Sequence, residues 1–110
     1  MIASLLQYQY IVGYGIGQYY DYIKSRLPKE VHFKFLCDAK WEQVGNEYDG
    51  IEVISPDILR NLESVFVVVF SGNARNWQSI RAMLDDMGHP YIHADKLIGI
   101  RNTITGKELK

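Results

Sequence analysis

Three glycines at alternate positions, Gly13, Gly15 and Gly17, follow the β-prone run Gln9–Val12 and precede apolar residues at helical spacing. Glycine lets the backbone turn sharply and approach a ligand closely. The N-terminus of the following helix offers free N–H groups and the positive end of a dipole to an anion. A turn of this kind typically binds a pyrophosphate. We therefore predict a phosphate-binding turn made of Gly13, Tyr14, Gly15, Ile16, Gly17 and Gln18.

An acid follows the second β-prone run, Val31–Cys37, at the position where dinucleotide-binding folds place their ribose-binding carboxylate, roughly 20 residues beyond the turn. We predict that Asp38, with Ala39 and Lys40 beside it, binds ribose hydroxyls. Its side chain should project into a crevice, so that its loss would barely change fold stability. The match has one departure, because the third glycine of G-x-G-x-x-G belongs at position 18, where this chain has glutamine.

A second polar turn, Ser71, Gly72 and Asn73, follows the uniformly apolar run Val65–Phe70. An apolar run of this kind is typical of a strand buried on both faces of a parallel sheet. The carboxyl ends of neighbouring parallel strands lie at one edge of the sheet, and ligands bind there at the point where the strand order reverses. We therefore expect a crevice between the glycine turn and the second polar turn.

Two other residue pairs have catalytic or metal-binding spacing but lie in the wrong context. Tyr20 and Lys24 repeat the Tyr-x-x-x-Lys spacing of short-chain dehydrogenases, but they fall on the first helix, directly after the glycine turn. His89 and His93 are four residues apart, as in a helical zinc pair. Pro90 and the strand-like residues between the histidines break the helical register. We interpret both pairs as structural.

Cys37 and Trp41 flank the predicted ribose acid. Cys37 ends an apolar strand and is best interpreted as a small core residue. Trp41 follows in a loop over Asp38–Glu42, where it either stacks on a nucleobase or anchors the loop.

The composition limits the class of protein. The 110 residues contain 47% hydrophobic residues, enough for a single core, and the formal charge of −1 gives no reason to expect nucleic acid or an anionic membrane as partner. One cysteine excludes an internal disulfide framework and fits a reducing compartment. No apolar run approaches the roughly 20 residues of a membrane helix, and residues 1–6 are too short for a secretory signal. We expect a cytoplasmic protein.

The elements alternate between strand and helix. The predicted helices cover 17–27, a brief stretch after the capping sequence Ser55-Pro56-Asp57 that carries Ile58, Leu59 and Leu62, and Ala74–Met87 with Gly88 as C-cap. The predicted strands are Gln9–Val12, Val31–Cys37, Ile51–Ile54, Val65–Phe70 and Pro90–His93. This alternation predicts an α/β fold, a three-layer Rossmann-like domain with a mostly parallel five-stranded sheet in the order 3-2-1-4-5. Residues 1–110 should form one domain, with a core over 9–95, an N-terminal segment over 1–8 and a polar tail or linker over 102–110.

Four segments carry a family resemblance: "IVGYGIGQYYDYI", "FLCDAKW", "YDGIEVISPDIL" and "VFVVVFSGN". Together they resemble the small Rossmann domains of bacterial surface-polysaccharide and sugar-modifying enzymes, and are similar to CoA-binding domains. The resemblance covers about residues 9–95. It implies contacts of Gly13, Gly15, Gly17 and Asp38 with a nucleotide, NAD or a nucleotide-sugar.

Three functions stay open on this basis. The first is a nucleotide- or nucleotide-sugar-binding module associated with surface-sugar biosynthesis or modification, without catalysis of its own. The second is an NAD-dependent oxidoreductase fragment that needs a separate catalytic domain. The third is a ligand-free oligomerisation or interaction domain. Eight tyrosines and an apolar N-terminal segment favour a homodimer, or attachment to a catalytic domain.

Overall fold

The computed structural model describes residues 2–98, so the predicted tail over 102–110 lies outside the described residues. The helices are α1 (Ile2–Leu6), α2 (Gln18–Ile23), α3 (Trp41–Val44), α4 (Pro56–Asn61), α5 (Ala74–Met87) and a helical segment over 94–98, and the 3-10 turn η1 (Lys24–Arg26) continues α2. The strands are β1 (Tyr10–Tyr14), β2 (Phe35–Cys37), β3 (Glu47–Tyr48), β4 (Ile51–Ile54), β5 (Val65–Val69) and β6 (Tyr91–His93).

The fold is α/β, with a mostly parallel sheet of six strands in the order β3-β4-β2-β1-β5-β6. The prediction of a five-stranded sheet in the order 3-2-1-4-5 is wrong, because the polar segment over 45–50 contains a strand where the sequence suggested only turns. This strand, β3, pairs antiparallel with β4 through Glu47 with Glu52 and Tyr48 with Ile51. Every other neighbouring pair is parallel.

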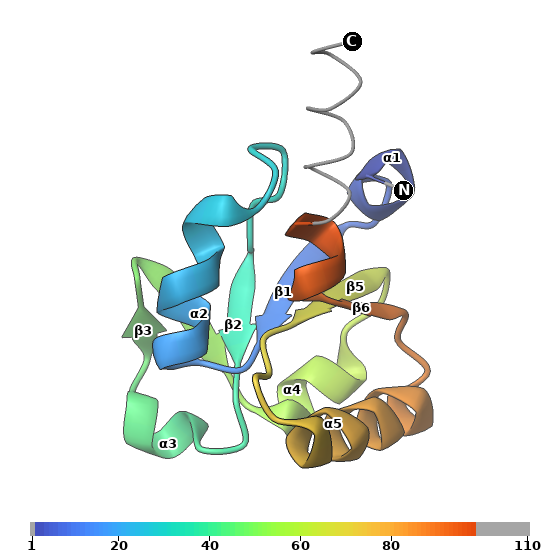
Figure 1. The fold of residues 1–110 in the computed structure, drawn as a ribbon. Coiled ribbons are helices and arrows are strands. Elements are labelled where there is room, and N and C mark those ends of the chain that lie inside the picture. The colour runs from blue at the N-terminus through green and yellow to red at the C-terminus, as the bar shows by residue number, and fades with distance from the viewer. Residues whose placement is uncertain (1, 99–110) are drawn as a thin grey trace, which may run out of the picture.

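Helices cover both faces of the sheet (Figure 1). One face carries α4 and α5, and the other carries α1, α2 and the segment over 94–98. Side chains along each strand alternate between the two layers: Val12 and Val67 pack in the cluster with Leu84 of α5, whereas Ile11 and Val68 pack in the cluster with Tyr20 of α2. The three layers enclose two cores, one on each side of the sheet.

Strand β5 is buried at all five residues and lies between β1 and β6. The prediction of a strand buried on both faces is therefore confirmed. Burial of one valine side chain contributes about 1.5–3 kcal/mol, so the valines of β5 hold the two cores together.

Several element boundaries differ from the prediction. β2 begins at Phe35 instead of Val31, because the Val31 N–H donates to the Pro28 carbonyl within a turn. β1 extends to Tyr14, two residues beyond its predicted end. The segment after β2 also folds into a helix, α3, which begins at Trp41 where the sequence suggested a loop.

The helix caps follow the sequence. The Ser55 side chain caps α4 by accepting from the Ile58 N–H, and Gly88 ends α5 in the left-handed conformation at φ 80°. Asn73 caps the N-terminus of α5 through its side-chain oxygen. Of the apolar residues that α4 carries, Leu59 is fully buried and Ile58 is 50% exposed.

Candidate functional site

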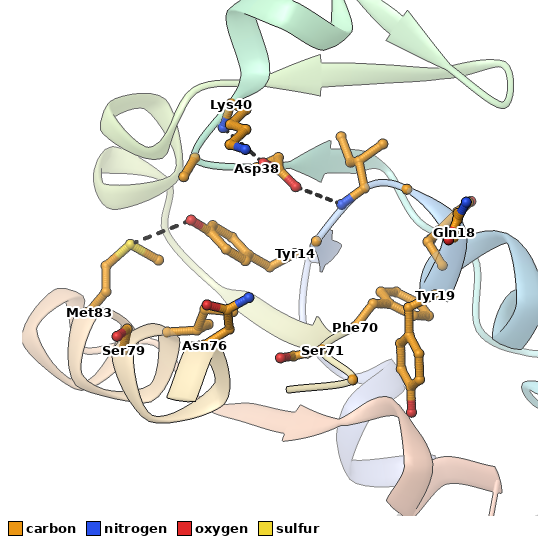
Figure 2. A pocket seen from close by; sticks show the side chains of 17 residues that line it. Tyr14, Gln18, Tyr19, Asp38, Lys40, Phe70, Ser71, Asn76, Ser79 and Met83 are labelled. Atoms are coloured by element: carbon orange, nitrogen blue, oxygen red, sulfur yellow. Dashed lines mark hydrogen bonds between the residues drawn. The ribbon is translucent and has the colours of Figure 1, made fainter. Parts of the chain in front are cut away.

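A cavity of about 580 Å³ lies beyond the carboxyl ends of β1, β2 and β5. The chain leaves β1 towards α2 on one face of the sheet and leaves β5 towards α5 on the other, so the strand order reverses between these two strands. This is the crevice position expected for an open α/β sheet. Figure 2 shows the lining residues, which are Tyr14, Gly15, Ile16, Gly17, Gln18, Tyr19, Tyr20, Asp38, Ala39, Lys40, Phe70, Ser71, Gly72, Asn76, Ser79, Ile80 and Met83.

Gly15 and Gly17 give the turn after β1 its shape, with φ angles of 108° and 147° that side chains rarely adopt. A Cβ atom on Gly15 would lie 2.3 Å from the Phe70 carbonyl oxygen, so the turn and the end of β5 pack backbone to backbone. A Cβ atom on Gly17 would meet nothing within 4 Å. Gly15 is therefore required by the fold, whereas the backbone at Gly17 is open to a ligand.

Gly13 does not line the cavity. It lies inside β1, opposite Leu36 on one side and Val68 on the other. A Cβ atom at this position would come within 2.8 Å of the Leu36 side chain. Packing between β1 and its neighbours therefore explains this glycine without a ligand.

Both carboxylate oxygens of Asp38 accept hydrogen bonds from the backbone. One accepts from the Ile16 N–H at 2.7 Å and the other from the Lys40 N–H at 2.8 Å. Asp38 thus joins the glycine turn to the start of the next loop. In Figure 2 a dashed line from the labelled Asp38 carboxylate to a backbone nitrogen of the turn marks the bond to Ile16. These two hydrogen bonds argue against the expectation that its loss would barely change stability. A carboxylate offers about four acceptor positions, so roughly two remain for a ligand.

The charges around the cavity are few. Among the described lining residues, Lys40 is the one cationic side chain and Asp38 the one anionic side chain. Ala39, Lys40 and Gln18 are exposed at its rim. The site therefore combines one carboxylate, one ammonium and backbone N–H groups, a set that suits a ribose and a phosphate more than a polyanion.

The second turn contributes Ser71 and Gly72 to the cavity, but not Asn73, whose side chain caps α5. The Ser71 hydroxyl donates to the Asn73 carbonyl and accepts from the Asn73 N–H, so it is used within the turn. A Cβ atom on Gly72 would lie 3.2 Å from the Tyr19 ring. This turn therefore packs closely on the start of α2.

Sequence reasoning missed the wall that α5 contributes. Asn76, Ser79, Ile80 and Met83 line the cavity from this helix. They recur at i, i+3, i+4 and i+7, which places them on one helical face. Once a crevice was expected beside the second turn, this spacing could have identified them. Tyr19, Tyr20 and Phe70 were also missed.

Tyr14 places a hydroxyl group beside the α5 wall. The side chain is 5% exposed, and its hydroxyl donates to the Met83 sulfur at 3.9 Å. A thioether is a weak acceptor, so this hydroxyl is poorly satisfied for a buried tyrosine. Burial, followed by the effects of Cys37 and Asp38, raises the pKa of Tyr14 well above its usual value. The hydroxyl stays protonated and can donate to a ligand.

The Tyr20–Lys24 pair serves the fold. Tyr20 donates its hydroxyl to Asp49 at 2.8 Å, and Lys24 pairs with the same carboxylate at 2.9 Å. Asp49 adopts a left-handed backbone at φ 56° in the turn between β3 and β4. The pair therefore fixes this hairpin to α2, as the structural interpretation predicts.

The two histidines bind different carbonyl oxygens, His89 that of Leu59 and His93 that of Ser71. Within residues 2–98, no group of three or more His, Cys, Asp and Glu side chains could hold a metal ion. Cys37 is fully buried, and burial together with Asp38 raises the pKa of its thiol to about 12. The prediction of a core cysteine is confirmed.

Trp41 does not line the cavity. It begins α3 and is 37% exposed, beyond the turn that Asp38 and Lys40 form. Base stacking by Trp41 stays a prediction.

In the part of the chain over 2–98, no helix combines the length and apolar character needed to cross a membrane. Comparison of the chain with protein-family models, curated proteins and solved structures found no match.

Proposed function

We propose that this chain binds a nucleotide, either NAD or a nucleotide-sugar, in the crevice beyond β1, β2 and β5. The observation that carries the proposal is the convergence of three segments on one cavity. These are the Gly15–Gly17 turn, Asp38 at the end of β2, and the Ser71–Gly72 turn after β5. Ligands of open α/β sheets bind at this reversal of strand order.

Each segment has a separate role in the proposal. The remaining acceptor positions of Asp38 take hydrogen bonds from ribose hydroxyls. The exposed backbone at Gly17 and the ammonium group of Lys40 receive the phosphates. Tyr14, with Asn76 and Ser79 of α5, forms a partly polar wall beside the base. In this proposal the chain binds the nucleotide but does not catalyse a reaction. A partner chain or an attached domain, as in the surface-polysaccharide enzymes whose Rossmann domains the sequence resembles, carries out the reaction on the sugar.

Titration calorimetry with NAD, NADP, UDP-sugars, CDP-sugars and AMP tests the proposal. We expect one of these nucleotides to bind, and Asp38→Ala to weaken its affinity at least about tenfold. Preference for NAD over every nucleotide-sugar would favour the oxidoreductase fragment. If no nucleotide binds, the proposal fails and the interaction-domain alternative takes its place.

A further inference from the structure

A second, smaller cavity of about 280 Å³ lies on the other side of the turn after β5. Its lining includes Tyr19, the turn Ser71–Asn73, Trp77, His93 and Asp95. Tyr19, Ser71 and Gly72 also line the main crevice. Ligand-binding pockets usually measure about 300–1,000 Å³. The second cavity is therefore large enough for about one ring. Because it shares a wall with the main crevice, the rest of the same ligand could lie in that crevice.

His93 lines this cavity and contacts the turn after β5. Its Nε2 lies 2.6 Å from the Ser71 carbonyl oxygen, which can only accept, so Nε2 carries the proton. Its Nδ1 lies 3.1 Å from the Asp95 backbone nitrogen. The side chain is 11% exposed. These two contacts fix the orientation of the imidazole ring.

Asp95 supplies the cavity's one formal charge among its described lining residues. One of its oxygens accepts from the Tyr19 hydroxyl. The other lies 3.6 Å from Nδ1 of His93, which is longer than a hydrogen bond. This oxygen therefore remains available to a ligand donor. Burial and the bond to Asp95 raise the pKa of Tyr19 to about 12, which keeps the phenol a donor to the carboxylate.

The rest of the cavity offers ring faces and a further donor. Trp77 and Tyr19 both pack edge-on to His93, at centroid distances of 5.0 and 6.1 Å. The Asn73 side-chain oxygen accepts from two backbone N–H groups. These bonds do not use the two donors of its NH₂ group. A carboxylate, an amide and aromatic rings, with no lysine or arginine among the described lining residues, suit a neutral group rich in hydroxyls. A phosphate or carboxylate would be repelled by Asp95.

We propose that this cavity binds the sugar ring of a nucleotide-sugar whose nucleoside diphosphate occupies the main crevice. The inference rests on the proposed nucleotide binding and deepens it. Asp95 accepts a hydrogen bond from a sugar hydroxyl, and the Asn73 amide donates to another. The turn Ser71–Gly72 separates the two cavities and faces the link between the diphosphate and the sugar.

Paired ligands separate the contribution of the sugar from that of the nucleotide. Titration calorimetry compares UDP with UDP-glucose, ADP with ADP-glucose, and ADP with NAD, for the wild type and for Asp95→Ala. In the pair whose base the protein accepts, we expect the nucleotide-sugar to bind at least about tenfold tighter than its nucleoside diphosphate, the contribution of one charge-assisted hydrogen bond. Asp95→Ala should abolish this difference and leave the affinity for the nucleoside diphosphate unchanged.

Asp86→Ala is the matched control, because it removes an exposed carboxylate of the same charge at the far end of α5, where it pairs with Arg60 of α4. It should keep the full gain from the sugar. Nucleoside diphosphate binding without any gain from the sugar, or a gain that Asp95→Ala leaves intact, would overturn the sugar subsite alone. If NAD binds tighter than ADP but the nucleotide-sugars bind no tighter than their nucleoside diphosphates, the sugar subsite is overturned, and the second cavity would instead hold the nicotinamide riboside of NAD. Failure of every nucleotide to bind would overturn both proposals.

Discussion

Replacement of Asp38 should affect stability and binding together, and the structure sets the size of the first effect. The carboxylate accepts from the N–H groups of Ile16 at 2.7 Å and of Lys40 at 2.8 Å. A hydrogen bond to a charged group contributes about 1.5–3 kcal/mol. The turn is partly exposed, so the lower end of this range applies. Asp38→Ala should therefore lower the free energy of unfolding by about 3 kcal/mol.

Asp38→Asn distinguishes the two hydrogen bonds. The amide keeps one acceptor oxygen but presents an NH₂ group to the second backbone N–H. We expect a loss of at least about 1.5 kcal/mol, between wild type and Asp38→Ala. Chemical denaturation in urea measures both variants, and a slope of about 1–3 kcal/mol per molar converts 3 kcal/mol into a midpoint shift of about 1 M or more.

Asp86→Ala again serves as the control. Its carboxylate is 72% exposed and pairs with Arg60 at 3.0 Å. Exposed pairs of this kind contribute about 0–1 kcal/mol. If Asp38→Ala shifts the urea midpoint no more than Asp86→Ala does, the two backbone hydrogen bonds do not hold the glycine turn and the reasoning is refuted. Nucleotide affinity is then compared at a temperature where every variant is folded.

The remaining predictions concern three single substitutions. Tyr14→Phe removes a hydroxyl bonded to the Met83 sulfur at 3.9 Å. The free energy of unfolding should change by less than about 0.5 kcal/mol, while calorimetry should show about tenfold weaker nucleotide binding. Unchanged affinity would exclude a contact between this hydroxyl and the ligand. Gly15→Ala places a Cβ 2.3 Å from the Phe70 carbonyl oxygen, so we expect a loss of about 3 kcal/mol or more in thermal denaturation; wild-type stability would contradict this packing. Hydrogen bonds from Lys24 of η1 and Tyr20 of α2 lower the pKa of Asp49 below 3.8. The contribution of Asp49 to stability is therefore present above about pH 4 and is lost as the pH falls through the lowered pKa. Asp49→Asn should therefore flatten the stability profile below pH 4, and an unchanged acid limb would argue against the pair.

The sequence allowed the crevice to be predicted because its determinants are local. A run of apolar residues at Val65–Phe70 indicates a buried strand, and polar turns at the ends of two such strands indicate where a ligand can enter. The capping residues Ser55 and Gly88 were equally readable, since each acts within one turn of its own helix. The predictions that held were those decided by neighbours in the sequence.

The main failure concerns the segment over 45–50, which contains a strand. Strand β3 has only two residues, Glu47 and Tyr48, and forms because β4 offers an unpaired edge. The Tyr48 hydroxyl is further held by Asp21 of α2, at 2.9 and 3.0 Å to its two carboxylate oxygens. The short polar segment over 45–50 has neither the length nor the alternation that indicates a strand. Its pairing with β4 is local, because the two strands meet across Asp49-Gly50, where both residues have positive φ angles. This dipeptide is typical of two-residue hairpins and is a signal that the prediction did not use. The contact with Asp21, 27 residues away, lies outside any local pattern.

The glycine motif itself was read two residues too early. β1 continues through Gly13 and Tyr14, so the turn begins at Gly15, and G-x-G-x-x-G counted from Gly15 places Tyr20 where the third glycine belongs. That glycine normally permits close packing of helix and strand. Here the Tyr20 ring is buried and packs against Phe70 at 4.9 Å and Phe33 at 6.4 Å. An aromatic cluster therefore fills the space between α2 and the sheet. Because the Tyr20 hydroxyl continues to the β3–β4 hairpin, the residue that departs from the motif also ties α2 to the edge of the sheet.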